Sequence, residues 1–158
     1  MATKMVILFD GVCYFCNRAV RFIIKRDPKA RFVFASLQSP IGQKLLQHYG
    51  LPTTLNSMVL IQGERYFLRS DAALKIASHL AGFYRLLGIF WIVPRFVRDI
   101  FYNLVARNRY KWWGKLDSCP IPTAEEKSRF LNEKKDLEDL KVYLQTSTKE
   151  KSYGHLPT

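Results

Sequence analysis

Cysteine and histidine are scarce in this sequence, which holds only three of each among its 158 residues. A small, odd number of cysteines disfavours a disulfide-stapled scaffold. A structural zinc site takes about four ligands, often from two close pairs. Besides the pair Cys13 and Cys16, the sequence offers only isolated candidates without ligand spacing: Cys119, His48, His79 and His155. We therefore expect no bound metal.

Acidic residues are also few: 13 against 25 lysines and arginines, for a formal net charge of +12. Such an excess can attract nucleic acid, anionic lipid or an acidic protein. The basic residues are spread from Lys4 to Lys151, and no helix-turn-helix, zinc-finger or RNA-binding signature accompanies them. We expect a solvated basic surface and no nucleic-acid partner.

Long apolar runs and a leader segment are missing as well. The apolar stretch between Arg85 and Arg95 is far shorter than the roughly 20 residues that cross a bilayer. Residues 1–4 lead directly into an apolar run at 5–9, with no cleavage site of small residues. These features predict a cytoplasmic protein.

What the sequence does contain is a regular succession of strands and helices. Short apolar runs bounded by turn residues predict strands, and apolar positions that recur at three and four predict helices. The predicted order is strand, helix, strand, helix, hairpin and helix, at residues 4–9, 13–25, 31–35, 40–49, 57–69 and 72–80. The hairpin turns at Gln62-Gly63, and Ser70-Asp71 is expected to cap the last helix.

This order predicts an α/β fold. Two strands joined through a helix should be parallel, whereas a hairpin adds antiparallel pairs to the same sheet. With 48% hydrophobic residues, the chain can bury one core. We expect residues 4–82 to form a mixed sheet flanked by helices.

Beyond this core, residues 83–122 are predicted to form a helical extension. Apolar and charged positions recur at helical spacing on either side of Pro94, as expected for helices packed on the core. The basic and aromatic character of the segment also permits contact with a membrane surface. Residues 123–144 predict a charged helix capped by Thr123 with Glu126, and residues 145–158 predict a disordered tail.

The segment Asp10-Gly-Val-Cys13-Tyr-Phe-Cys16 lies where the first strand becomes the first helix. Unpaired N–H groups and the dipole at a helix N-terminus stabilise negative charge, so a cysteine there tends to be more acidic than a free thiol. Cys13 is expected to be the more thiolate-like sulfur, nearer the surface, with Cys16 one turn inward. A thiolate at Cys13 can attack the disulfide of a partner, and Cys16 can then resolve the mixed disulfide.

Three neighbouring side chains each have two interpretations. Asp10 either accepts the proton of Cys16 as that thiol attacks or serves only the turn with Gly11. Tyr14 and Phe15 either shape the surface that a substrate meets or dock into the core of the protein itself.

These residues resemble the DCC family of predicted thiol-disulfide oxidoreductases, whose first motif is similar to residues 10–16. Ser70-Asp71-Ala72-Ala73-Leu74 resembles the second motif, and Arg107-Asn108-Arg109-Tyr110 with Cys119 resembles the C-terminal one. The resemblance covers residues 5 to about 120 and implies a thioredoxin-like fold of the short, glutaredoxin-like kind. Where thioredoxin-like proteins usually place a cis-proline facing the redox pair, this chain has Asn56-Ser57.

The second and third motifs supply further candidate site residues. Ser70 and Asp71 are expected to cap a helix, with a substrate-facing role as the alternative. Arg107 and Arg109 can lower the pKa of a nearby thiolate if the fold returns them to it. Cys119 is either a third redox thiol or a small buried hydrophobic residue.

Together these features predict an enzyme, a thiol-disulfide oxidoreductase that exchanges disulfides with a protein partner. No bound cofactor is expected, because the thiols themselves carry the electrons. The rival hypothesis is a non-enzymatic module that docks on a membrane or a membrane protein through the basic aromatic segment 83–113, with cysteines that are only structural.

Overall fold

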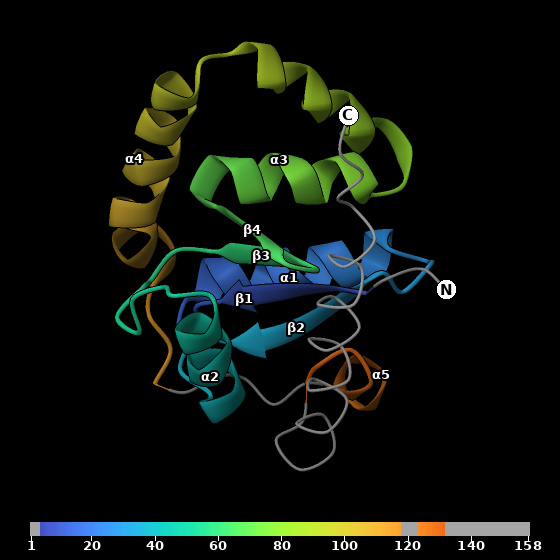
Figure 1. Ribbon diagram of the computed structural model, residues 1–158, viewed down its shortest axis with the longest axis vertical. Helices are drawn as coiled ribbons and strands as arrows, with labels where there is room; N and C mark the ends of the chain where they lie inside the picture. The colour runs from blue at the N-terminus through green and yellow to red at the C-terminus, as the bar shows by residue number, and fades with distance from the viewer. Residues whose placement is uncertain (1–3, 118–122, 132–158) are drawn as a thin grey trace, which may run out of the picture.

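The centre of the molecule is a four-stranded mixed sheet in the order β2-β1-β3-β4 (Figure 1). The computed structural model describes residues 4–117 and 123–131. β1 runs parallel to β2 and antiparallel to β3, which in turn pairs antiparallel with β4. The strands are β1 (Met5–Phe9), β2 (Phe32–Ser36), β3 (Val59–Gln62) and β4 (Arg65–Leu68). This confirms the predicted mixed sheet and a thioredoxin-like fold.

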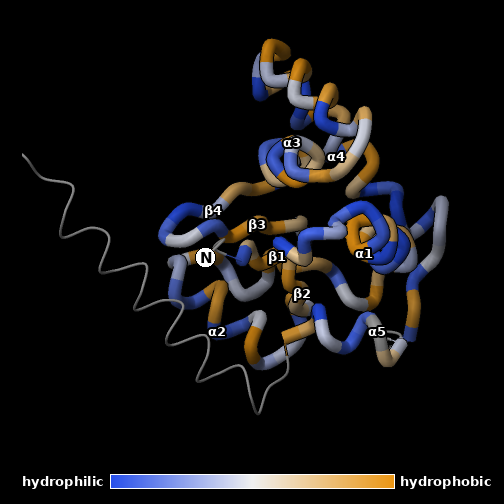
Figure 2. The backbone as a smooth tube through the Cα atoms, turned by 90° about the vertical axis from the view of Figure 1, so that its right-hand side faces the viewer, coloured by the Kyte–Doolittle hydropathy of each residue, from blue (hydrophilic) through white to orange (hydrophobic). Residues whose placement is uncertain are grey.

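Both faces of the sheet are buried, and helices cover them unequally. α1 (Tyr14–Arg26) and α3 (Arg69–His79) share one apolar cluster with Ile7 and Phe9 of β1. α2 (Pro40–His48) packs with Val6 and Leu8 on the opposite face. Figure 2 shows α1 and α2 on opposite sides of the sheet. Successive side chains of a strand point to opposite faces, which explains how one five-residue strand serves both clusters.

The hairpin between β3 and β4 turns as predicted. β3 ends at Gln62 and β4 begins at Arg65, and Gly63 takes a φ of 59° in the turn. Glycine adopts this left-handed conformation without the steric cost that a side chain imposes.

The predicted cap of α3 is wrong. The helix begins at Arg69, and its N-cap is Leu68, which provides no side-chain cap. Ser70 and Asp71 lie inside the first turn instead. Ser70 Oγ donates to Asp99, and Asp71 accepts from Arg98 at 2.9 Å. These long-range partners on the following helix replace the local capping bond.

Residues 82–113 form two helices in the region where a helical extension over 83–122 was predicted. The 3₁₀ helix η1 (Gly82–Ile92) passes over α3 on the side away from the sheet, and α4 (Arg95–Trp113) descends from there toward the start of α1 (Figure 1). Pro94 separates the two helices. η1 contains no buried residue. None of the helices in residues 4–117 and 123–131 combines the length and the apolar character needed to cross a bilayer.

The predicted charged helix at 123–144 is much shorter than expected over its described part. α5 (Ala124–Lys127) has the predicted capping box between Thr123 and Glu126 but ends at Lys127. The chain then pairs with the edge of the sheet, where Phe130 bridges to Phe34. Phe130 packs, partly buried, against the core cluster that contains Phe34. Residues 132–144, and the tail predicted at 145–158, lie outside the described residues.

Candidate active site

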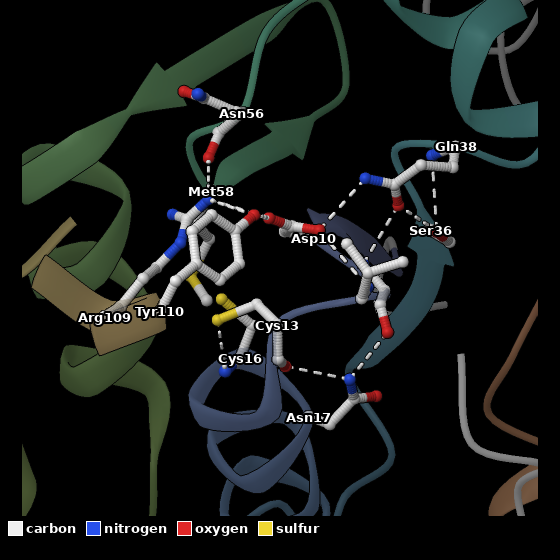
Figure 3. A network of polar contacts seen from close by, with 12 residues as sticks. Asp10, Cys13, Cys16, Asn17, Ser36, Gln38, Asn56, Met58, Arg109 and Tyr110 are labelled. Atoms are coloured by element: carbon white, nitrogen blue, oxygen red, sulfur yellow. Dashed lines mark hydrogen bonds and ion pairs between the residues drawn. The ribbon is translucent and has the colours of Figure 1, made fainter. Parts of the chain in front are cut away.

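Cys13 and Cys16 lie at the start of α1, immediately after β1. Cys13 is the N-cap of the helix, and the backbone N–H of Cys16 donates to Cys13 Sγ at 3.3 Å. Both cysteines carry free thiols, and Figure 3 shows the two sulfur atoms close together below the side chain of Asp10. The sulfur of Cys13 thus takes the place of the oxygen that usually caps a helix, where negative charge is stabilised.

The expectation that Cys13 lies nearer the surface is wrong. Cys13 has no exposed surface, whereas Cys16 is 8% exposed. The segment after α4 covers Cys13: Lys115 forms a β-bridge with Cys13, and the N–H of Leu116 donates to Val12 O at 2.7 Å. This segment, residues 114–117, is called the strap below. Because the strap lies about a hundred residues from Cys13 in the sequence, the spacing of residues around Cys13 could not predict this cover.

Asp10 is buried at the end of β1 and accepts four hydrogen bonds, two on each oxygen. Val12 N–H at 3.2 Å and Gln38 Nε2 at 3.0 Å donate to Oδ1. Arg109 Nη2 at 2.7 Å and the Tyr110 hydroxyl donate to Oδ2. The bond from Val12 is the turn interaction expected of Asp10, and the other three tie the carboxylate to Gln38, just after β2, and to α4.

Only one of the two arginines singled out in the sequence reaches the site. Arg109 is 4% exposed and forms an ion pair with Asp10, and it also donates to Asn56 O at 2.8 Å. Arg107 is exposed, because two residues along a helix is more than half a turn. The charge of Arg109 lowers the pKa of Cys16, as expected for an arginine near a thiol.

Other influences on Cys16 are stronger than Arg109. Burial raises the pKa of the Cys16 thiol far above its ordinary value, and its hydrogen bond with Cys13 and the charge of Cys13 add to the rise. The negative charge of Asp10 acts in the same direction. The Cys16 thiol is therefore protonated at neutral pH, and its proton must leave whenever Cys16 acts as a nucleophile.

The loop opposite the cysteines, residues 56–58, is held by α4. Arg109 binds the carbonyl of Asn56, and the N–H of Met58 donates to the Tyr102 hydroxyl at 3.1 Å. Every peptide bond in the described residues is trans. In this chain, backbone groups next to the redox pair are thus occupied by side chains of the helical extension.

Of the residues predicted to meet a substrate, Tyr14 and Phe15 are exposed beside the cysteines. Phe15 packs on Trp113 with ring centroids 4.7 Å apart. Ser70 and Asp71 instead bind Asp99 and Arg98, as described above. Cys119 lies outside the described residues, and no cluster of three metal-ligating side chains occurs within them.

Sequence reasoning missed several residues of the site. Gln38, which follows β2, had no signal of its own. Tyr102 had one, because Tyr102, Ala106 and Arg109 recur at helical spacing and so lie on one face of α4. Tyr110 was quoted only as part of a motif, yet burial and its hydrogen bond to Asp10 raise its pKa, which keeps it a donor.

Comparisons with known proteins agree with this geometry. A family model described as DCC1-like thiol-disulfide oxidoreductase matches residues 7–115. The uncharacterized protein YuxK of Bacillus subtilis (strain 168) is 50% identical over 127 residues, which are 80% of this chain and 93% of YuxK. A chloroplastic DCC family protein of Arabidopsis thaliana is 40% identical over 120 residues, 75% of this chain and 70% of that protein. No solved structure matches the chain.

Proposed function

Because this chain belongs to the DCC1-like thiol-disulfide oxidoreductase family, we propose that it is an enzyme that exchanges disulfides with a protein partner through Cys13 and Cys16. One observation carries the proposal: two free thiols share the first turn of α1, with the N–H of Cys16 donating to Cys13 Sγ. That bond and the helix dipole stabilise the anion that attacks.

In the first step, the Cys13 thiolate attacks one sulfur of the partner's disulfide. A bond forms between Cys13 and the partner, the partner's S–S bond breaks, and its second sulfur leaves as a thiolate that takes up a proton. In the second step, Cys16 loses its proton and attacks Cys13 Sγ. The Cys13–Cys16 disulfide forms, and the partner leaves with both cysteines reduced.

Asp10 is the proposed acceptor of the Cys16 proton. It borders two pockets: an apolar one that Cys16 also lines, and a polar one of ≈ 590 Å³ lined by Gln38, Asn56, Lys115 and Asp117 among others. A carboxylate between a buried thiol and a polar pocket can pass a proton toward solvent. Four hydrogen-bond donors, one of them the ion-paired Arg109, hold the Asp10 carboxylate in a fixed position, where it can accept the proton.

Trapping of the first intermediate tests the proposal. Cys16→Ser should leave Cys13 able to attack but unable to release its partner, so a mixed disulfide accumulates. Mass spectrometry of non-reduced complexes would detect the conjugate on Cys13, and Cys13→Ser is the matched control that should trap nothing. Failure of the wild-type chain to form a reversible Cys13–Cys16 disulfide under mild oxidation would refute the proposal.

A second function, docking on an anionic membrane surface, is favoured by a specific observation. η1 and α4 expose twelve large hydrophobic side chains: Phe83, Leu86, Ile89, Phe90, Trp91, Ile92, Phe96, Ile100, Phe101, Leu104, Trp112 and Trp113. Arg85, Arg95 and Arg107 on the same segment are exposed too, so apolar and basic groups occur together, as at interfacial helices. Docking is compatible with the redox activity, and the cytoplasm remains our proposed compartment.

A further inference from the structure

An apolar pocket of ≈ 440 Å³ opens beside the redox pair, between α1, α3, η1 and α4. Its walls are almost wholly hydrophobic, and Ala73, Leu87, Phe101 and Ala106 are among the residues that line it. Sites for small molecules commonly have volumes of about 300–1,000 Å³, apolar walls and a few polar groups. The disulfide exchange proposed above makes no use of this pocket.

The polar groups of the pocket gather at the cysteines. Asp10, Cys16, Tyr102 and Arg109 line it, whereas Cys13 does not. Arg109 is 4% exposed, and its Nε has no hydrogen-bond partner among the described residues. A buried N–H donor without an acceptor is costly, and it points to a ligand that brings an acceptor oxygen.

We propose that this pocket binds a lipid-soluble quinone that reoxidises the dithiol. Its ring and isoprenoid tail match the apolar walls, its carbonyl oxygens suit the donors of Arg109 and Tyr102, and it accepts two electrons and two protons. The proposal rests on the thiol chemistry proposed above, with the exchange running in the opposite direction. The Cys13–Cys16 disulfide that the quinone forms oxidises two thiols of the protein partner to a disulfide, and Cys13 and Cys16 return to thiols.

The reaction balances in atoms and electrons. The two S–H bonds of Cys13 and Cys16 break, and one S–S bond forms. The two electrons and two protons released pass to the two carbonyl oxygens of the quinone, which leaves as the hydroquinone. Cys16 is the sulfur next to the quinone, and Asp10, which lines the same pocket, is placed to carry its proton. Phe101 of α4 is exposed and also lines the pocket, together with Leu87 of η1, so a lipid-soluble molecule would enter at this rim.

The test uses the reduced full-length chain and ubiquinone-1, without oxygen. Because this quinone is fully substituted, its ring does not trap thiols by simple arylation. We expect one quinone reduced per protein, followed by its ultraviolet absorbance, together with the Cys13–Cys16 disulfide detected by alkylation and mass spectrometry. Exchange with oxidised glutathione provides the reference rate for each variant.

Ala106→Trp places a large side chain in the pocket and should lower the ratio of the quinone rate to the reference rate by at least about tenfold. Asn103→Trp, on α4 but not lining the pocket, is the matched control and should leave the ratio unchanged. If Ala106→Trp fails to fold, calorimetric titration of the redox-inert Cys13→Ser/Cys16→Ser chain with ubiquinone-1 should still show stoichiometric binding.

The outcomes separate the two proposals. Normal exchange with glutathione but no quinone reduction, or an unchanged ratio in Ala106→Trp, would overturn the quinone site and leave the exchange function standing. Failure to form the Cys13–Cys16 disulfide with either oxidant would overturn the exchange function itself.

Discussion

The Cys16 thiol shows how burial and charge act together on one residue. Burial is the largest cause of its raised pKa, Asp10 adds to the rise, and Arg109 opposes it. In the unfolded chain the same thiol would ionise near pH ~8.5. The environment therefore favours the protonated form of Cys16, so the proposed second step of exchange needs a base to remove the proton.

A pH profile of alkylation should report this environment. In Cys13→Ser, the midpoint for alkylation of Cys16 by iodoacetamide should lie above pH ~8.5, because burial persists without Cys13. Adding Asp10→Asn should lower that midpoint, since a negative charge that raises the pKa of Cys16 is gone. Asp71→Asn, a carboxylate outside the pocket, is the control. A midpoint at or below that of an ordinary thiol would contradict the role of burial.

Arg109 and Arg107 form a matched pair for a stability experiment. Arg109→Gln removes one partner of a buried ion pair and leaves Asp10 without its charge partner, which should cost about 3–5 kcal/mol of unfolding free energy. Arg107→Gln changes an exposed residue on the same helix and should stay within about 0.5 kcal/mol. Urea denaturation of the two variants measures the difference in unfolding free energy. Equal losses of unfolding free energy would show that the ion pair does not stabilise the fold.

At the scale of elements, α4 and the strap bring residues from a hundred positions away to Asp10 and Cys13. α4 supplies Arg109 and Tyr110 to Asp10, and Tyr102 to the backbone of Met58. The strap begins at Gly114, the C-cap of α4, whose φ of 85° suits a glycine. Since Cys13 has no exposed surface, the proposed exchange requires the strap to move before a protein disulfide can reach Cys13.

Loosening the strap should therefore expose Cys13. Leu116→Pro removes the N–H that donates to Val12 O, and losing one hydrogen bond of about 1 kcal/mol favours opening roughly fivefold. Alkylation of Cys13 in a Cys16→Ser background should accelerate by a similar factor. Leu116→Ala, which keeps the backbone donor, should accelerate less. An unchanged rate in Leu116→Pro would mean that Cys13 is reached by another path.

The whole molecule combines a closed core with an open apolar surface. Both faces of the sheet are covered by helices, yet η1 leaves Ile92 81%, Leu86 72% and Ile89 67% exposed. Monomeric soluble proteins rarely expose so large an apolar patch unless something binds it. The net charge of +12 makes an anionic bilayer surface a complementary partner.

Flotation with vesicles tests this surface. The chain should float with phosphatidylserine-containing vesicles at low salt and less at high salt, because screening weakens the basic contribution. Leu86→Asp and Ile92→Asp should each weaken binding by about tenfold or more, as each loses a buried apolar side chain. Tyr66→Asp, exposed on β4, is the control. No retention at low salt would remove the docking proposal.

Much of the core was predictable because its causes are local. The continuous apolar run of β1, the apolar spacing of α1 and the glycine of the hairpin each depend on neighbouring residues, and the strands formed close to where the pattern predicted. The family resemblance, resting on short motifs, is confirmed over residues 7–115. The predicted cap of α3 was wrong because its cause is not local: Ser70 and Asp71 bind residues of a distant helix instead of capping their own.

The sequence by itself determined the redox pair, its position at a strand-to-helix junction and the order of the elements, since these depend on neighbouring residues. Only the tertiary structure decided that Cys13 is covered by the strap, that Arg109 rather than Arg107 meets Asp10, and that an apolar pocket opens at Cys16. Each of these depends on which distant segments pack together. Burial and charge pairing arise from that packing, and the spacing of residues along the sequence does not predict which distant segments meet.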